Sequence, residues 1–309
     1  MLKIDVFAHI STPAYLKRYI ELVPEIGKRS EAYKRTMHDI DVRENLMRRH
    51  PDILQIITMG NIPLEYYASP KDAVELAKIG NDELAELVKQ KPGLFYGTVG
   101  MLPLNDIPAS LEMIDYCLRD LHMLGIQLYT SHEREPLSEP KYRPIFAKVA
   151  EYDKAVWIHP SSSLDIDRGM FSWPYDSSSC MFNLVRSGIY DEFPDLKIII
   201  HHAGAMVPFL KERVKTIMAF IGRKRAADHF KKFYVDTAIY GNTAGLMSTY
   251  DFFGASHMLF GTDSPLGAPQ GSNGDTDCTL SAVEKMNIPE AEKEMILRDN
   301  AMNLFGILI

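Results

Sequence analysis

Several common residue patterns are scarce or missing in this chain, and each absence excludes a class of protein. Cysteine occurs only three times, as Cys117, Cys180 and Cys278. This odd number and wide spacing exclude a disulfide framework and a CxxC metal knuckle, so we expect a reducing, cytoplasmic location. No run reaches the ~18 apolar residues of a membrane span, and no signal-peptide pattern is present at the start. We therefore expect no membrane partner.

Positive charge is also in short supply. The chain has 34 Lys and Arg against 41 Asp and Glu, which gives a formal net charge of −7 at pH 7. An acidic surface repels phosphate backbones, so we expect no nucleic-acid partner. Glycine is missing from the turn after the first apolar segment, where a dinucleotide-binding open sheet carries a Gly-rich loop.

Apolar residues make up 46% of the 309-residue chain, which is enough for a large core. Short β-rich segments alternate with longer amphipathic ones that predict helices at 71–90, 109–123 and 142–152. The predicted strands are 3–8, 53–59, 94–99, 125–129, 155–158, 197–201, 232–236 and 257–261.

Eight such units in one chain predict an α/β fold of the (β/α)8 TIM-barrel type. A doubly wound open sheet is the structural alternative. We expect a single domain over residues 1–309, because no linker or repeat divides the chain. The longest insertion, 10–51, follows the first strand, and we expect it to form a flap near the site or a dimer contact.

Polar residues collect where these strands end, which in a barrel is the catalytic face. The strand-end residues are His9, His159, His201, His202, Asp236 and Asp263. Each alone has an ordinary structural role as a hydrogen-bonded histidine or a turn-capping aspartate. Together they favour a shared site, because neutral imidazole and carboxylate are ligands that zinc accepts.

The same residues lie in an ordered set of motifs that resembles a known family. The motifs are KIDVFAH, FYGTVGMLP, GIQL, WIHP, FPDLKIIIHHAGAMVPF, FYVDTA, FGTDSP and NAMNLFGI. In this order they resemble the amidohydrolase-related decarboxylases, a family that includes aminocarboxymuconate semialdehyde decarboxylase and γ-resorcylate decarboxylase. The resemblance spans nearly the whole chain.

The resemblance implies a barrel with one divalent metal, zinc or alternatively manganese, bound by His9, His159 and Asp263. It assigns proton transfer to His202, which stands six residues before Pro208, together with Asp263. His201 is then expected on the opposite strand face, packed outward or hydrogen-bonded. The resemblance also implies a homodimer or homotetramer.

This chain departs from the family at Phe7, where the first strand normally carries a second metal-binding His or Glu. Phenylalanine offers no lone pair, so metal occupancy is expected to be weaker. Phe7 is an alternative apolar wall for an aromatic substrate. Trp173 is a candidate for stacking on a planar substrate, and Arg168 and Arg213 are candidates for binding its carboxylate.

The expected reaction is therefore removal of carbon dioxide from a small aromatic or unsaturated carboxylic acid. Two alternatives stay open at this point. The same His and Asp residues suit metal-dependent hydrolysis of an amide, lactone or ester. The loss of a ligand at Phe7 suits a catalytically inactive barrel that acts as a binding protein.

Overall fold

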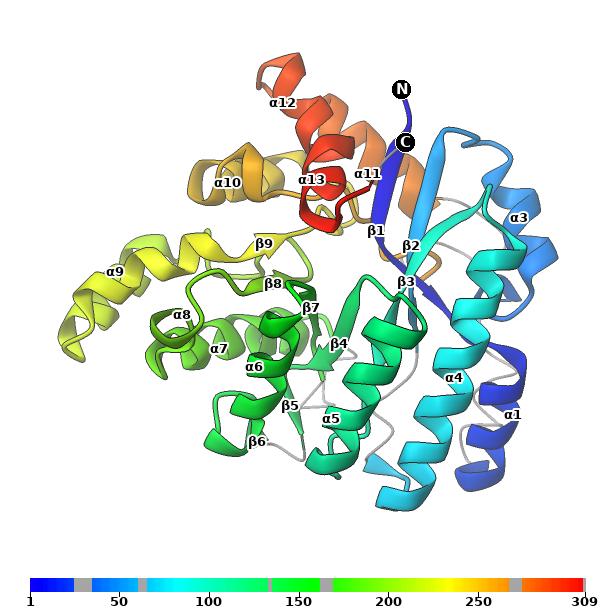
Figure 1. Cartoon of the computed structure of the whole chain (residues 1–309). Coiled ribbons are helices and arrows are strands. Elements are labelled where there is room, and N and C mark those ends of the chain that lie inside the picture. The colour runs from blue at the N-terminus through cyan, green and yellow to red at the C-terminus, as the bar shows by residue number, and fades with distance from the viewer. Residues whose placement is uncertain (25–34, 61–65, 133–134, 162–168, 267–273, 308–309) are drawn as a thin grey trace.

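A computed structural model describes residues 1–24, 35–60, 66–132, 135–161, 169–266 and 274–307. Within them, seven parallel strands form one curled sheet in sequential order (Figure 1). The strands are β1 (Lys3–Ile10), β2 (Ile53–Met59), β3 (Phe95–Met101), β4 (Gly125–Tyr129), β7 (Ala155–His159), β8 (Lys197–Ile200) and β9 (Tyr234–Val235). Sequential parallel order is the barrel arrangement and excludes the doubly wound sheet.

The eighth position of the barrel is filled by residues 258–264, which pair with strands on both sides. Met258 forms a bridge to Val235 on β9, and Ser264 forms one to Ala8 on β1. The His9 amide donates to the Ser264 carbonyl at 2.7 Å. The prediction of a regular strand at 257–261 is wrong: Ala255–His257 form a 3-10 turn, and the segment that follows pairs through isolated bridges rather than a continuous ladder.

Helices pack around the outside of the sheet (Figure 1). They are α1 (Pro13–Leu22), α3 (Ile40–Met47), α4 (Pro70–Gln90), α5 (Ile107–Asp115), α6 (Arg143–Glu151), α7 (Ser172–Arg186), α8 (Ile189–Glu192), α9 (Lys211–Phe220), α10 (Thr243–Phe253), α11 (Gly274–Glu284), α12 (Glu290–Glu294) and α13 (Asn300–Phe305). Within the described residues, none is both long and apolar enough to cross a membrane.

The predicted helices at 71–90 and 142–152 correspond to α4 and α6, while 109–123 corresponds to α5 followed by a π-helical turn. A two-stranded hairpin of β5 (Ser131–His132) and β6 (Glu135–Pro136), which was not predicted, follows β4. Its strands are too short to leave a periodic signal in the sequence.

The described part of the 10–51 insertion belongs to the outer helical layer. Helix α1 packs against α4, and the Glu83 carboxylate accepts hydrogen bonds from the Ala14 and Tyr15 amides at its start. Arg18 pairs with Glu75 on the same helix, α4. Residues 25–34 lie outside the described part, so the flap or dimer contact stays a prediction, as does the single domain over 1–309.

The amino end of the barrel is closed by α13. The indole ring of Trp157, which is fully buried inside the barrel, stacks on Phe305 with ring centres 5.1 Å apart. Its N–H donates to the Val6 carbonyl at 3.1 Å. Truncating a buried aromatic of this kind typically costs about 3–5 kcal/mol. The chemistry must therefore face the other end, where the strands finish.

A β-bulge in β1 sets which side chains enter the barrel. Pairing with β2 slips by one residue between Asp5 and Ala8. The buried carboxylate of Asp5 accepts the Phe7 amide at 3.2 Å, within the bulge. Ile4, Val6 and Phe7 all join the interior cluster, whereas Ala8 and Ile10 join the outer core. Bulges commonly re-aim side chains beside active sites.

We expect Asp5 to make stability depend on pH, because burial raises its pKa from 3.8 to about 6. The folded protein then keeps a proton that the unfolded chain loses above about pH 4. In urea unfolding, the advantage of wild type over Asp5→Asn should fall by about 3 kcal/mol in total as the pH rises, mostly between pH 4 and pH 6, and become flat only above about pH 7. A difference that is constant over this range would contradict the assignment.

Candidate active site

The barrel mouth holds a cluster of four imidazoles and one carboxylate. His9 ends β1, His159 ends β7, and His201 and His202 follow β8. Asp263 lies within the segment that closes the barrel, beside β1, where its amide donates to the Phe7 carbonyl at 2.9 Å. The strand-end residues that the sequence singled out therefore do converge.

His9 and Asp263 form the tightest pair in this cluster. His9 Nδ1 lies 2.9 Å from the Thr58 hydroxyl, which orients the ring. His9 Nε2 lies 3.1 Å from Asp263 Oδ1, and the two side chains are 2% and 4% exposed. Apart from this contact and the more distant His202, the described residues give neither His9 Nε2 nor the Asp263 oxygens a well-aligned hydrogen bond. Buried polar atoms of this kind are costly unless a further group satisfies them.

His159 lies beside this pair. Its Nδ1 is 2.8 Å from the Pro160 carbonyl, and since a carbonyl only accepts, Nδ1 carries the proton and Nε2 keeps its lone pair. The ring centres of His9 and His159 are 5.3 Å apart. Burial and the neighbouring His9 hold the pKa of His159 well below its ordinary value, so it is a neutral donor.

His202 faces Asp263 from the other side, with Nε2 3.8 Å from Oδ2. Burial lowers the pKa of His202, but Asp263 raises it by more, so the net shift is upward. Burial raises the pKa of Asp263, but His202 and His9 lower it by more, so it lies well below its usual range. Both shifts act in the direction that favours an imidazolium on His202 beside a carboxylate on Asp263.

His201 is in the cluster too, contrary to the expectation that it lies on the opposite face. Its ring stacks on Phe7 with centres 3.5 Å apart, and its Nδ1 lies 2.7 Å from Asp236 Oδ2. Strand alternation would put His201 and His202 on opposite faces of the sheet, but β8 ends at Ile200 and His202 has a left-handed φ of +61°. The turn brings both rings inward.

Phe7 lies beneath the histidines, at the centre of the cluster. Its ring centre is 4.6 Å from that of His9 and 5.8 Å from those of His159 and His202. The side chain is fully buried. It is an apolar floor below the donors, and it has no exposed surface on which a substrate would rest.

Of the remaining candidate site residues, Trp173 lies at the cluster and Arg213 lies away from it. Trp173, at the start of α7, stacks on His202 with ring centres 6.0 Å apart and covers that side of the cluster. Arg213 lies exposed on α9 and lines a separate groove with Tyr175 and Met206. Arg168 lies outside the described residues.

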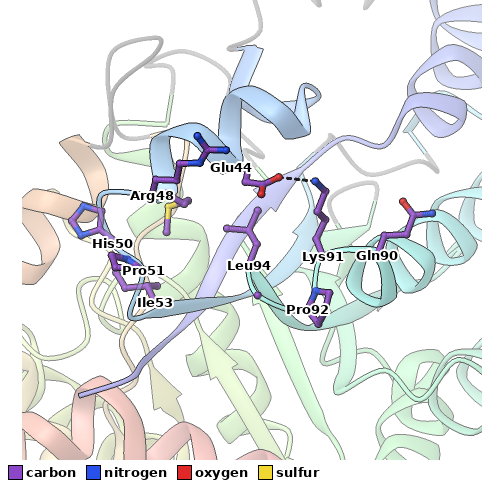
Figure 2. A pocket seen from close by; sticks show the side chains of 11 residues that line it. Glu44, Arg48, His50, Pro51, Ile53, Gln90, Lys91, Pro92 and Leu94 are labelled. Carbon is purple, nitrogen blue, oxygen red and sulfur yellow. Dashed lines mark hydrogen bonds and ion pairs between the residues drawn. The ribbon is translucent and has the colours of Figure 1, made fainter.

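A cavity at the opposite end of the barrel has a different character (Figure 2). It lies where β2 and β3 begin, next to Ile53 and Leu94, and its Lys91 is paired with Glu44 at 2.6 Å. The amino-terminal face of a barrel serves stability rather than catalysis. We therefore place the active site at the histidine cluster.

The donor atoms partly fit a divalent ion. Ligand bonds of about 2.0–2.2 Å put two donors roughly 3.3 Å apart and two imidazole centres roughly 5 Å apart. The 3.1 Å His9–Asp263 spacing and the 5.3 Å between the His9 and His159 ring centres agree with this. Within the described residues, however, no three His, Cys, Asp or Glu side chains form a complete metal site. His9 Nε2 and Asp263 Oδ1 are thus a pair of atoms spaced as metal ligands, called the donor pair below, and His159 lies alongside them.

Comparison with known proteins decides the family. Residues 4–307 match the sequence model of the amidohydrolase family. The chain belongs to the amidohydrolase family. This result confirms the resemblance predicted from the motifs, and the barrel agrees with it.

Two curated amidohydrolase relatives are decarboxylases. The γ-resorcylate decarboxylase of a Rhizobium species is 27% identical, over 99% of this chain and 98% of its own. The 2-amino-3-carboxymuconate-6-semialdehyde decarboxylase of Dictyostelium discoideum is 25% identical, over 87% of this chain and 77% of its own. Both act on small carboxylic acids, as their names state.

A solved amidohydrolase structure matches across almost the whole fold. The dihydroxybenzoic acid decarboxylase of a Polaromonas species is 26% identical, with a TM-score of 0.83, over 99% of this chain and 97% of its own. That structure contains bound manganese and the inhibitor 2-nitroresorcinol. Its barrel supports the fold described above.

Removing the charge of Asp263 should lower the pKa of His202. In Asp263→Asn the carboxylate no longer favours the imidazolium, and burial then favours the neutral ring. We expect the His202 pKa to fall, measured by NMR titration of ¹⁵N-labelled histidine in metal-free protein. An unchanged His202 pKa would contradict the pairing.

Proposed function

We propose that this protein is a non-oxidative carboxy-lyase that removes carbon dioxide from a small hydroxylated aromatic or unsaturated acid. The decarboxylase relatives support this reaction class. The observation that carries it is the His202–Asp263 pair beside unsatisfied donors. It offers a proton from His202 beside electron-pair donors that suit a divalent cation, in one buried space.

We also propose that His9, His159 and Asp263 hold one divalent ion, either zinc or manganese. The 3.1 Å donor pair and the free Nε2 of His159 support this. When bound, such an ion would orient a carboxylate and a neighbouring hydroxyl and polarise them. Because Phe7 contributes no lone pair, only three protein ligands are available, which leaves room for substrate oxygen atoms.

In this proposal His202 donates the proton. Decarboxylation of an aromatic acid requires protonation of the carbon that bears the carboxylate. The bond to the carboxylate then breaks, its electron pair returns to the ring system, and carbon dioxide leaves. His202 is suited to this step because Asp263 keeps it protonated. Trp173, stacked on His202, is positioned to shield this transfer from water.

Two further candidate roles concern Phe7, from its place in the cluster, and Arg168, from the sequence alone. Phe7 keeps the floor of the site apolar, and a dry site strengthens the electrostatic contacts above it. Arg168 remains a candidate partner for the substrate carboxylate, since guanidinium binds carboxylate through two parallel hydrogen bonds.

Turnover should depend on His202 and Asp263 in different ways. His202→Asn should lower the rate by about 10²–10⁴-fold without loss of bound metal, because a proton donor is not a ligand. Asp263→Asn should lower both the rate and the metal content. The measurements are carbon dioxide release from hydroxybenzoates and muconate-type acids, and metal analysis of the purified variants.

A second substrate panel separates the alternatives. Lactones and amides are tested with the same metal-loaded enzyme. Turnover of this panel alone would reassign the protein as a hydrolase. No turnover in either panel, together with no metal binding, would support an inactive binding protein.

We propose further that the protein is a homo-oligomer. Large apolar side chains are exposed on α7, on α9 and on the turn before α9, among them Phe171, Tyr175, Phe209 and Phe220. Phe209 and Phe220 are 85% and 87% exposed. Exposed aromatic side chains of this kind are enriched in protein–protein contacts. The contact was expected from the helices after the early strands or from the 10–51 insertion, whereas these side chains favour α7 and α9.

The double variant Phe209→Ser/Phe220→Ser should shift the mass in solution toward that of one chain, measured by light scattering at micromolar concentration. Tyr67→Ser is the control, because Tyr67 is 49% exposed outside α7 and α9. A wild-type protein that is already monomeric, or a double variant with unchanged mass, would contradict the assignment.

A further inference from the structure

Four residues outside the histidine cluster connect the two members of its donor pair. We propose that Arg43, Gln55, Asp5 and Thr262 form a positioning network that fixes the spacing between His9 and Asp263. The network thereby sets the affinity of the site for its ion. This inference rests on the proposed function for the ion and extends it to residues that do not themselves reach the site.

All four side chains are buried. Asp5 and Gln55 have no exposed surface, and Arg43 and Thr262 are each 3% exposed. Their positions in the fold are spread over α3, β2, β1 and the segment that closes the barrel. A buried charged network is costly unless every group is satisfied, so its presence next to the site calls for a reason.

One end of the network holds His9 by its backbone. Arg43 reaches from α3 and donates Nη1 to the His9 carbonyl, and its Nε donates to Gln55 Oε1 at 3.0 Å. Hydrogen bonds from a charged donor are stronger than neutral ones. The His9 carbonyl is therefore fixed from outside the sheet, while the His9 imidazole points into the cluster.

The other end holds the chain on both sides of Asp263. Asp5 accepts the Thr262 amide at 3.1 Å and the Thr262 hydroxyl at 2.7 Å. The Thr262 oxygen in turn accepts the Ser264 amide at 3.2 Å. Asp263 lies between these two contacts in a left-handed conformation, with φ of +59°. Such a conformation costs about 1–3 kcal/mol and persists only where its surroundings enforce it.

Gln55 joins the two ends. Its Nε2 donates to Asp5 Oδ2 at 3.0 Å while its Oε1 accepts from Arg43, so the amide orientation is fixed by both neighbours. Asp5 and Gln55 are also direct partners across β1 and β2. The result is one continuous chain of hydrogen bonds from the His9 carbonyl to the amides that flank Asp263.

A purely structural role predicts a different outcome from a positioning role. If the network only stabilises the fold, a lost hydrogen bond lowers the free energy of unfolding and leaves ion binding alone. If it positions the donor pair, the same loss also weakens binding of the ion. Outer contacts that orient metal ligands are typically worth about 10–100-fold in affinity.

The test compares Thr262→Val with Thr98→Val. Thr98 is a matched control, since its buried hydroxyl donates one hydrogen bond, 3.0 Å to the Ile57 carbonyl, and it is not part of the network. The readouts are the dissociation constant for Zn²⁺, the visible absorption spectrum of bound Co²⁺, and the melting temperature. Gln55→Met is the second network variant, in case Thr262→Val does not fold.

We expect Thr262→Val and the control Thr98→Val each to lower the melting temperature. Only the network variants should weaken Zn²⁺ binding, by about 10–100-fold, and change the Co²⁺ spectrum. Thr262→Ser, which keeps the hydroxyl, should restore both. A dissociation constant that stays within about twofold of wild type in Thr262→Val or Gln55→Met overturns the proposal.

Crystal structures separate this inference from the proposed function. If the wild-type protein binds no divalent ion, the proposed ion site fails, and the His9–Asp263 spacing in metal-free crystals decides the network. A spacing that widens by about 0.5 Å or more in Thr262→Val and not in Thr98→Val supports positioning. A spacing that stays at 3.1 Å in both overturns it.

Discussion

The closure of the barrel between β1 and residues 258–264 is the interaction on which the site depends. At this seam the His9 amide donates to Ser264, and the Asp263 amide donates to Phe7, so the backbone bonds that shut the sheet also place the two donor side chains. In an open sheet these residues would lie at opposite edges. Barrel closure and donor pairing are therefore one structural event.

The arrangement of charge follows from the seam. Asp263 is an anion enclosed by two imidazoles, and its field keeps a proton on His202 while His159 stays neutral. Two neighbouring histidines thus have pKa values shifted in opposite directions, because burial dominates at His159 whereas the Asp263 carboxylate dominates at His202. Phe7 strengthens the effect of the Asp263 charge, because an apolar ring at the centre of the cluster leaves little room for water to screen that charge.

Much of this was predictable from the sequence, because buried parallel strands leave long apolar runs and the residues that end them must converge. His9, His159, His202 and Asp263 were found in this way. The inward position of His201 was not, since a left-handed residue after the strand breaks the alternation that the sequence pattern implies. The positioning network was also hidden. Asp5, Gln55, Arg43 and Thr262 are far apart in the chain and carry no shared motif, and only the bulge and barrel closure bring them together.

The separation along the chain has a consequence for how the molecule folds. Asp5 and Thr262 are 257 residues apart in sequence and in direct contact in the folded protein. Joining the ends of a loop of that length costs roughly 5 kcal/mol in chain entropy beyond a constant, and contacts of such range form slowly. The seam is thus expected to close late, after the helices and most strand pairs are in place. The His9–Asp263 pair would be assembled by that final step, so that a barrel with an open seam has neither residue in place beside the other.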